Sequence, residues 1–213
     1  MRKKKILIFI LPALAVIALD RFTKHLVRTR PALQHWDVIP GWLNFQYTLN
    51  PGMAMGMRSI YIPVFNVSIP ISTVEVSVIS MLATIGIIGY VFYTMSRARL
   101  GYLFLMGMIV GGAIGNIIDR FIMAKIGGYG GILDGHVVDF IHFIPKIHGY
   151  PVFPYVFNVA DASITTAIIA LLIFNKQILP QRKDEEDETS ENKAISPGDM
   201  LSEDELKNES ESQ

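Results

Sequence analysis

The chain has 213 residues, of which 51% are hydrophobic and only 18% are charged, a composition that favours a membrane protein over a soluble one. It contains no cysteine, which excludes disulfides, zinc thiolates and thiol nucleophiles. The net charge of zero is the sum of two unlike parts: residues 184–213 hold twelve acidic and two basic side chains (−10), whereas residues 1–183 hold seven acidic and seventeen basic ones (+10). We therefore predict a membrane domain over residues 1–183, whose charge suits an anionic membrane surface, and a disordered acidic cytoplasmic tail over 184–213.

The membrane domain is predicted to be mainly α-helical. A helix that crosses a bilayer needs roughly 20 mostly apolar residues. The second and third candidate segments are separated only by residues 96–99, so these two helices should form an antiparallel hairpin. The four expected spans lie at about residues 6–26, 74–95, 100–120 and 156–176, with long loops at about 27–73 and 121–155.

The basic residues predict how the chain is oriented in the membrane, because cytoplasmic loops carry an excess of Lys and Arg. Arg97 and Arg99 lie in the short turn, and Arg182 and Lys183 follow the fourth apolar segment. Both termini are therefore expected on the cytoplasmic side and both long loops on the external side.

Asp20 and Lys24 lie at the end of the first expected span, four residues apart with the acid first, which favours an ion pair within a helix. We interpret them as structural support for a polar helix end, with a catalytic role as the alternative. They also argue against a cleaved secretory signal peptide, which the basic start and the apolar stretch after it otherwise resemble.

A second polar group lies at the end of the third expected span. Asn116, Asp119 and Arg120 are three and four residues apart and share one helix face, and the small residues of Gly111–Gly115 allow a close helix approach. Asp119 and Arg120 are neighbours in sequence, so each is expected to find its partner on another element. We interpret the three as the scaffold of a site; an ordinary polar helix end is the alternative.

Two more carboxylates lie beside apolar spans, where an ionisable group costs about 2.5–3.5 kcal/mol and therefore suggests function. Asp139 interrupts an apolar run after the third span, and Asn158 and Asp161 share one face of the fourth. Antiparallel third and fourth spans would bring Asp139 and Asp161 together at their external ends. Two such carboxylates share a proton, so that one can activate water while the other donates to a carbonyl oxygen.

This pair predicts aspartyl proteolysis without a metal or cofactor, but the spacing alone equally fits the proton relay of a non-enzymatic transporter. Transporters usually show internal repeats and broken helices, and the sequence has no evident repeat. A third hypothesis is a membrane-anchored binding protein that uses the external aromatic residues Trp42, Phe45 and Tyr47. The histidines lack the spacing with Glu of a helix-borne zinc site.

Five motifs, in order along the chain, resemble those of the bacterial lipoprotein signal peptidases, also called signal peptidase II. Asp20-Arg-Phe-Thr-Lys is similar to the D-x-x-[ST]-K motif of the family, and Asn50-Pro-Gly-Met-Ala-Met-Gly is similar to N-x-G-A-A-F. The segment Gly111–Arg120 resembles G-G-A-x-G-N-x-x-D-R, and Val137–Phe140 and Phe157–Asp161 resemble the two catalytic blocks. Each motif is weak alone, but five in order on a four-span chain are highly specific.

The resemblance implies an aspartyl endopeptidase of the bacterial cytoplasmic (inner) membrane. It would cleave diacylglyceryl-modified prolipoproteins just before the lipidated cysteine, with Asp139 and Asp161 as the catalytic dyad and a small external β-cradle at about residues 36–66. Its partners would be these prolipoproteins and membrane lipids, without nucleic acid, and we expect a monomer. The residues implied to bind substrate or support the site are Asn50, Gly52, Asn116, Asp119, Arg120, Asn158, Asp20 and Lys24.

Three features depart from the family pattern. Met53 and Met55 stand where Ala and Phe are usual, so contacts with substrate or inhibitor should differ there. The stretch Lys125–Gly135 is longer than is typical of the family, and the acidic tail is an extension.

Overall fold

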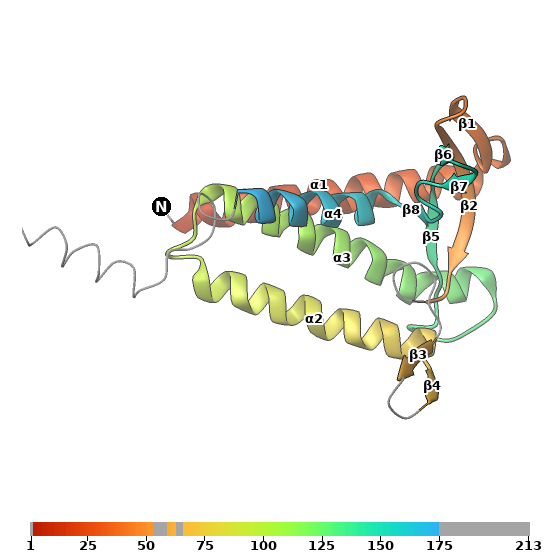
Figure 1. Ribbon diagram of the computed structural model, residues 1–213. Coiled ribbons are helices and arrows are strands. Elements are labelled where there is room, and N and C mark those ends of the chain that lie inside the picture. Colours follow the sequence, from red (N-terminus) through yellow and green to blue (C-terminus); the bar gives the residue numbers. More distant parts are fainter. Residues whose placement is uncertain (1, 53–58, 63–65, 175–213) are drawn as a thin grey trace, which may run out of the picture.

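The computed structural model describes residues 2–52, 59–62 and 66–174, and in this part the chain is mainly helical with a small antiparallel sheet at one end (Figure 1). Three helices are long and apolar enough to cross a membrane, and a fourth is apolar with 15 residues. The predicted fold class is thus confirmed for this part, and the tail at 184–213 lies outside the described residues. The helices are α1 (Arg2–Thr29), α2 (Thr73–Thr94), α3 (Leu100–Gly127) and α4 (Val159–Ile173).

Several helix ends differ from the expected spans for local reasons. The first helix already includes the basic residues before Ile6. Helix α3 continues past residue 120 to Gly127 and ends where Gly128, with a φ of 68°, takes the left-handed conformation of a helix C-cap. Helix α4 begins at Val159 rather than at residue 156, because Asn158 caps its first turn.

Helix α3 packs closely against both α1 and α4, and adjacent glycines make this possible. A Cβ on Gly111 would lie 2.6 Å from the carbonyl oxygen of Ala13 in α1, and one on Gly112 would lie 2.6 Å from that of Ala160 in α4. The close approach expected from the small residues of α3 is therefore observed.

Helix α2 is joined to α3 by the short turn at residues 95–99 and lies beside α3, on the side away from α1 and α4 (Figure 1). Val91 and Met95 are buried there against Phe9 and Leu103. The Lys5 ammonium group donates hydrogen bonds to the carbonyl oxygen of Met95 at 3.1 Å and to that of Ser96 at 2.7 Å. These contacts fasten the start of α1 to the hairpin between α2 and α3.

A four-stranded antiparallel sheet covers the opposite end of the helices, in the strand order β1-β2-β5-β8. It follows a short 3₁₀ helix at Pro31–Leu33. Two small hairpins, β3–β4 and β6–β7, form separate two-stranded sheets. The strands are β1 (His35–Ile39), β2 (Leu43–Asn50), β3 (Ser59–Ile62), β4 (Val67–Pro70), β5 (Val137–Phe143), β6 (Lys146–Ile147), β7 (Tyr150–Pro151) and β8 (Val156–Phe157).

The sheet shows the local structure around Asp139. This residue was expected in the loop at about 121–155, beside the end of the third span, and within that segment it lies in strand β5, opposite Thr48 of β2. The run Val137–Ile141 is rich in apolar and β-branched residues, and a short apolar run of this kind fits a buried strand or a helix equally well. The β-cradle expected at 36–66 therefore includes two strands, β5 and β8, from much later in the chain.

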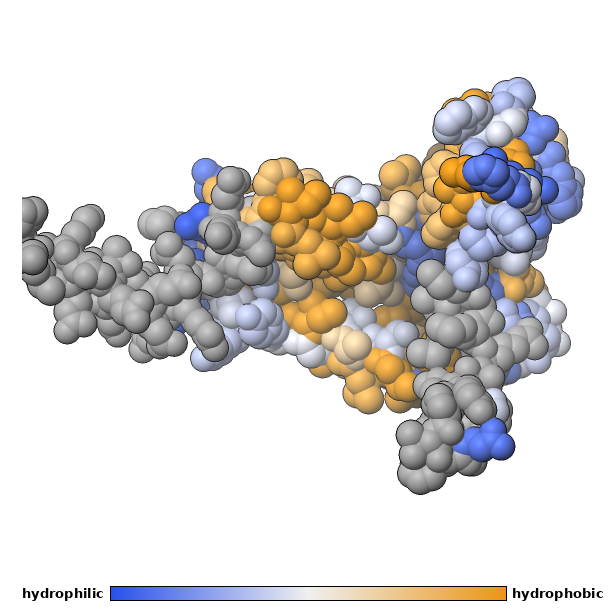
Figure 2. Space-filling view, viewed as in Figure 1, coloured by the Kyte–Doolittle hydropathy of each residue, from blue (hydrophilic) through white to orange (hydrophobic). Residues whose placement is uncertain are grey.

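The outer surface of the helices is apolar over its middle part, whereas hydrophilic residues gather at the sheet end (Figure 2). Large apolar side chains on the helices are exposed, among them Leu11, Leu14, Leu82 and Ile85. Together with the three long apolar helices, this surface indicates a multi-pass membrane protein.

Candidate active site

The site lies where the sheet meets the ends of the helices, and the pairing of two strands creates it. Strand β8 pairs with β5 through Ile141 opposite Phe157. The next residue, Asn158, is the N-cap of α4. The same strand pairing therefore places the first turn of α4 beside Asp139 in β5.

Asn158 is fully buried and contacts both predicted catalytic residues. Its Nδ2 group donates to Oδ1 of Asp139 at 2.7 Å, and its Oδ1 accepts from the backbone N–H of Asp161 at 3.0 Å. The Asp161 carboxylate in turn accepts from the backbone N–H of Asn158 at 3.2 Å, which completes a capping box. One asparagine thus fixes the position of both aspartates.

Two further asparagines bind the free sides of the two carboxylates. Asn116 of α3 donates to Oδ1 of Asp161 at 2.8 Å, and its own Oδ1 accepts from the Lys24 ammonium group at 2.9 Å. Asn50, at the end of β2, donates to Oδ2 of Asp139 at 3.0 Å. The Oδ1 atom of Asn50 accepts from the backbone N–H of Gly52, so its amide group is held in this orientation.

The two aspartates differ in environment. Asp139 is 3% exposed, whereas Asp161 is partly exposed. Burial raises the pKa of the Asp139 carboxyl from 3.8 to about 7, and the negative charge of Asp161 adds to this shift. The hydrogen bonds from Asn50 and Asn158 favour the ionised form and oppose the shift only in part. A carboxyl group with this pKa can hold a proton near neutral pH.

A buried ion cluster supports the site from the side of α1. Lys24 lies 3.0 Å from Oδ2 of Asp20 and 2.9 Å from Oδ2 of Asp119, so the expected pair between Asp20 and Lys24 is present. The cluster reaches two site elements directly: Asp119 accepts from the backbone N–H of Val138 at 3.1 Å, and Asp20 accepts from that of Ala160 at 3.2 Å. These bonds hold β5 and the start of α4 in place.

Arg21 belongs to this cluster, although no motif or spacing in the sequence indicated a role for it. Its guanidinium group lies 3.1 Å from Asp20 and 2.7 Å from Asp119. A count of charges could have indicated Arg21 from the sequence. Two buried carboxylates, Asp20 and Asp119, need two cations, and Lys24 supplies only one.

Arg120 turns away from its neighbour Asp119 and binds backbone carbonyls, as expected from their adjacent positions. Its guanidinium group donates to the carbonyl oxygens of Asn50 and Gly135, each at 3.2 Å, and to that of Gly52. It therefore fixes the end of β2, which carries Asn50, to the start of the segment that leads into β5.

The structure thus brings all ten predicted site residues into one connected network of hydrogen bonds and ion pairs. Among residues 2–52, 59–62 and 66–174, no three His, Asp or Glu side chains gather as a metal site would require. Met53 and Met55 lie outside the described residues.

The fold and this site, in which Asn158 joins Asp139 and Asp161 at the sheet end of the apolar helices, are those of a multi-pass membrane protein with a hydrogen-bonded pair of carboxylates. The model of the signal peptidase (SPase) II family matches residues 12–176. The chain therefore belongs to the signal peptidase II family and is a peptidase.

Individual relatives agree with this assignment. The lipoprotein signal peptidase of Chlorobaculum tepidum is 32% identical over 182 residues, which cover 82% of this chain and 98% of the relative. The lipoprotein signal peptidase of Chlorobium phaeobacteroides is 37% identical over 175 residues, which cover 78% of this chain and 94% of the relative. A solved structure described as a bacterial membrane enzyme, at 2.3 Å resolution, is similar with a TM-score of 0.55 and 28% identity, and the match covers 85% of this chain and 95% of that one.

Proposed function

We propose that this chain is an aspartyl endopeptidase that cleaves signal peptides from diacylglyceryl-modified prolipoproteins just before the lipidated cysteine. Membership of the signal peptidase II family supports the substrate class and favours a peptidase over the transporter, which the spacing of the carboxylates alone left open. The observation that carries the proposed mechanism is the double contact of Asn158 with Asp139 and Asp161.

In the proposed mechanism, Asp161 is the base and Asp139 is the acid. Asp161 is partly exposed and can contact water, and as a carboxylate it takes a proton while the water oxygen attacks the scissile carbonyl carbon. Asp139 is buried with a pKa of about 7, and it donates its proton to the carbonyl oxygen. When the tetrahedral intermediate collapses, Asp161 gives its proton to the leaving amine and Asp139 regains its own.

The proposed roles of the other residues follow from their contacts. Asn50, Asn116 and Asn158 orient the two carboxylates by donating to their oxygens. Lys24 orients Asn116 through its hydrogen bond to the side-chain oxygen. Asp119 and Asp20, which pair with Lys24, hold β5 and the start of α4. Arg120 holds Gly52 and the end of β2.

We further propose that both termini face the cytoplasm and that the site lies near the external face. The basic residues Arg97 and Arg99 lie in the turn between α2 and α3, and the sheet that carries Asp139 lies at the other end of these helices (Figure 1). The enzyme is proposed to act as a monomer and without a cofactor.

The direct test measures cleavage of a lipid-modified prolipoprotein by the purified chain. Asp139→Asn and Asp161→Asn should each lower kcat by at least about 10²-fold, because each removes one partner of the acid–base pair. Asp37→Asn, at an exposed aspartate of β1, is the matched control and should cleave normally. Full activity in either dyad variant would overturn the mechanism.

The substrate and the metal-free chemistry have separate tests. The same prolipoprotein without its diacylglyceryl group should be cleaved far more slowly, and equal rates would contradict the proposed substrate. A chelator such as EDTA should leave cleavage unchanged; inhibition that added metal reverses would show a metal-dependent reaction.

A further inference from the structure

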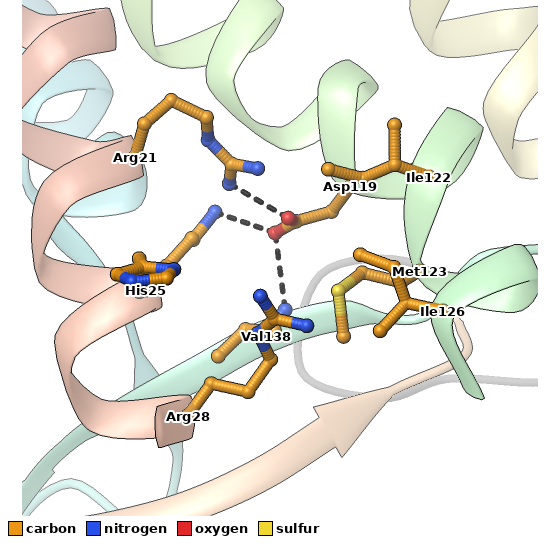
Figure 3. Close-up of a pocket in the computed structure, with 9 residues that line it drawn as sticks. Arg21, His25, Arg28, Asp119, Ile122, Met123, Ile126 and Val138 are labelled. Carbon is orange, nitrogen blue, oxygen red and sulfur yellow. Dashed lines mark hydrogen bonds and ion pairs between the residues drawn. The ribbon is translucent and has the colours of Figure 1, made fainter. Parts of the chain in front are cut away.

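A pocket with both charged and apolar lining residues lies between α1, α3 and β5, with a volume of about 260 Å³ (Figure 3). Arg21, Lys24, His25 and Arg28 of α1 line one side of it, and Asp119 of α3 lies opposite. Neither Asp139 nor Asp161 lines it. The proposed peptidase mechanism uses Asp119 and Lys24 only as support, so it leaves the pocket itself without a role.

The charges around this pocket do not cancel. Three permanent cations line it, Arg21, Lys24 and Arg28, against the single carboxylate of Asp119. Asp20 behind them compensates one more charge, since it pairs with Arg21 and Lys24. Three positive and two negative charges leave one positive charge, and Arg28 is the cation outside the ion cluster.

Two cationic groups at the pocket have hydrogen-bonding capacity that the described part of the chain does not use. The Nε atom of Arg21 is buried and has no hydrogen-bond partner among these residues; Oδ1 of Asp119 also has none, but it is ion-paired with Arg21 at 2.7 Å. The Arg28 guanidinium makes no hydrogen bond or ion pair with a side chain or backbone group of residues 2–52, 59–62 and 66–174. A buried donor without a partner costs free energy, and an anion in the pocket would remove that cost.

The other wall of the pocket is apolar and continues to the membrane-facing surface. Ile122, Met123 and Ile126 of α3 form this wall, as Figure 3 shows, opposite Arg21 and Arg28. Ile122 and Ile126 are exposed, and so is Phe22 of α1. The pocket therefore combines cations with an adjoining apolar surface at the sheet end of two membrane helices.

We propose that this pocket binds the phosphodiester headgroup of an anionic membrane phospholipid. The phosphate lies between the guanidinium groups of Arg21 and Arg28, which suit its oxygens geometrically, and the first part of an acyl chain lies on Ile122 and Ile126. A phosphodiester carries the negative charge that the pocket lacks. The apolar wall favours a lipid over free phosphate as the source of this group.

The test measures which lipids stay bound to the full-length chain in a neutral detergent, by native mass spectrometry with equal amounts of phosphatidylglycerol and phosphatidylcholine. The wild type should retain phosphatidylglycerol preferentially. Arg28→Gln should weaken this retention by about fivefold, the effect of one basic group near a headgroup. Arg30→Gln is the matched control, because Arg30 is two residues further along the chain, just past the end of α1, and does not line the pocket. It should change retention by less than about twofold.

Each other outcome of this experiment overturns part of the proposal. Equal losses in Arg28→Gln and Arg30→Gln would show a diffuse surface attraction rather than a pocket. No preference for phosphatidylglycerol in the wild type would exclude the site. If glycerol phosphate without acyl chains competes as well as the whole lipid, the ligand is a free phosphate and not a lipid.

The experiment is independent of the proposed peptidase mechanism. Asp139→Asn should retain phosphatidylglycerol like the wild type, because Asp139 does not line the pocket. Thermal unfolding in the same detergent identifies any variant that loses lipid merely because it is unfolded.

Discussion

The side-chain amide of Asn158 donates to Oδ1 of Asp139 over 2.7 Å, while the same side chain caps the helix that carries Asp161. The start of α4 and the position of the dyad are therefore set by one buried residue. A helix cap that ordinarily contributes only to stability here also aligns two carboxylates from different elements.

This relationship predicts that Asn158→Ala lowers kcat strongly but lowers the free energy of unfolding only modestly. The cap itself is worth about 0.5–2 kcal/mol, and Asp139 also loses the donor that orients it. We expect cleavage to fall by at least about tenfold, since a small misplacement of a catalytic group is costly, while KM changes little. Steady-state kinetics and a thermal unfolding curve measure the two effects on the same preparation.

Ser72→Ala is the matched control for this prediction. Ser72 also caps a helix through a capping box, with Glu75 of α2, but it contacts neither aspartate. It should lose a similar amount of stability and keep its cleavage rate. If both variants lose activity equally, Asn158 acts only as a helix cap.

The sequence predicted the parts of this site that local spacing determines. The four-residue separation of Asp20 and Lys24 predicted their ion pair, which is present at 3.0 Å. The adjacent positions of Asp119 and Arg120 predicted separate partners, and the structure shows them.

The parts that depend on long-range pairing could not be predicted in this way. Asp139 lies in a strand whose register with β2 places it opposite Thr48, and no local pattern links these two residues. The contacts of Arg21 with Asp119 likewise join α1 to α3 and follow only from the packing of the two helices. Family resemblance identified Asp139 without showing that it lies in a strand.

The ion cluster predicts that Lys24→Met destabilises the protein more than Arg21→Met. The Lys24 side chain is 3% exposed and pairs with two buried carboxylates, so its loss leaves buried charge uncompensated at a cost of about 3–5 kcal/mol. Arg21 is 24% exposed, and water can take over part of its role, so about 1 kcal/mol is expected. Lys125→Met, at an exposed lysine at the end of α3, should shift stability by less than about 0.5 kcal/mol. The opposite order for Lys24 and Arg21 in thermal unfolding would contradict the assigned burial.

Gly115 predicts a contrast between two glycine-to-alanine changes in membrane helices. A Cβ on Gly115 would lie 2.8 Å from Oδ2 of Asp20, which is held by Lys24, so Gly115→Ala should destabilise by about 1–3 kcal/mol and reduce cleavage. Gly86 of α2 has nothing within 4 Å of the same position, and Gly86→Ala should be neutral or stabilise by about 0.5–1 kcal/mol. Thermal unfolding measures both; a stable, active Gly115→Ala would mean that Asp20 can move freely.

The raised pKa of Asp139 predicts how the cleavage rate depends on pH. As the proposed acid it must be protonated, so kcat should fall as the pH rises through about 7. A pH profile of kcat measures this decrease on the alkaline side. In the proposed mechanism, kcat also decreases on the acidic side, because Asp161 becomes protonated and can no longer act as the base. An alkaline limb that begins well above pH 7 would show that another group donates the proton.

The same pKa also predicts how stability depends on pH. In the unfolded chain the Asp139 carboxyl has a pKa near 3.8, and in the folded chain it is about 7, so between these values the folded state binds more protons. Stability is then greatest below the unfolded pKa and falls as the pH rises towards 7, by at most about 4 kcal/mol for this one group. Asp139→Asn cannot ionise, so its Tm should decline less between pH 5 and pH 8 than that of the wild type. Parallel Tm profiles for the two proteins would mean that Asp139 is ionised throughout this range and does not hold the proton of the pair.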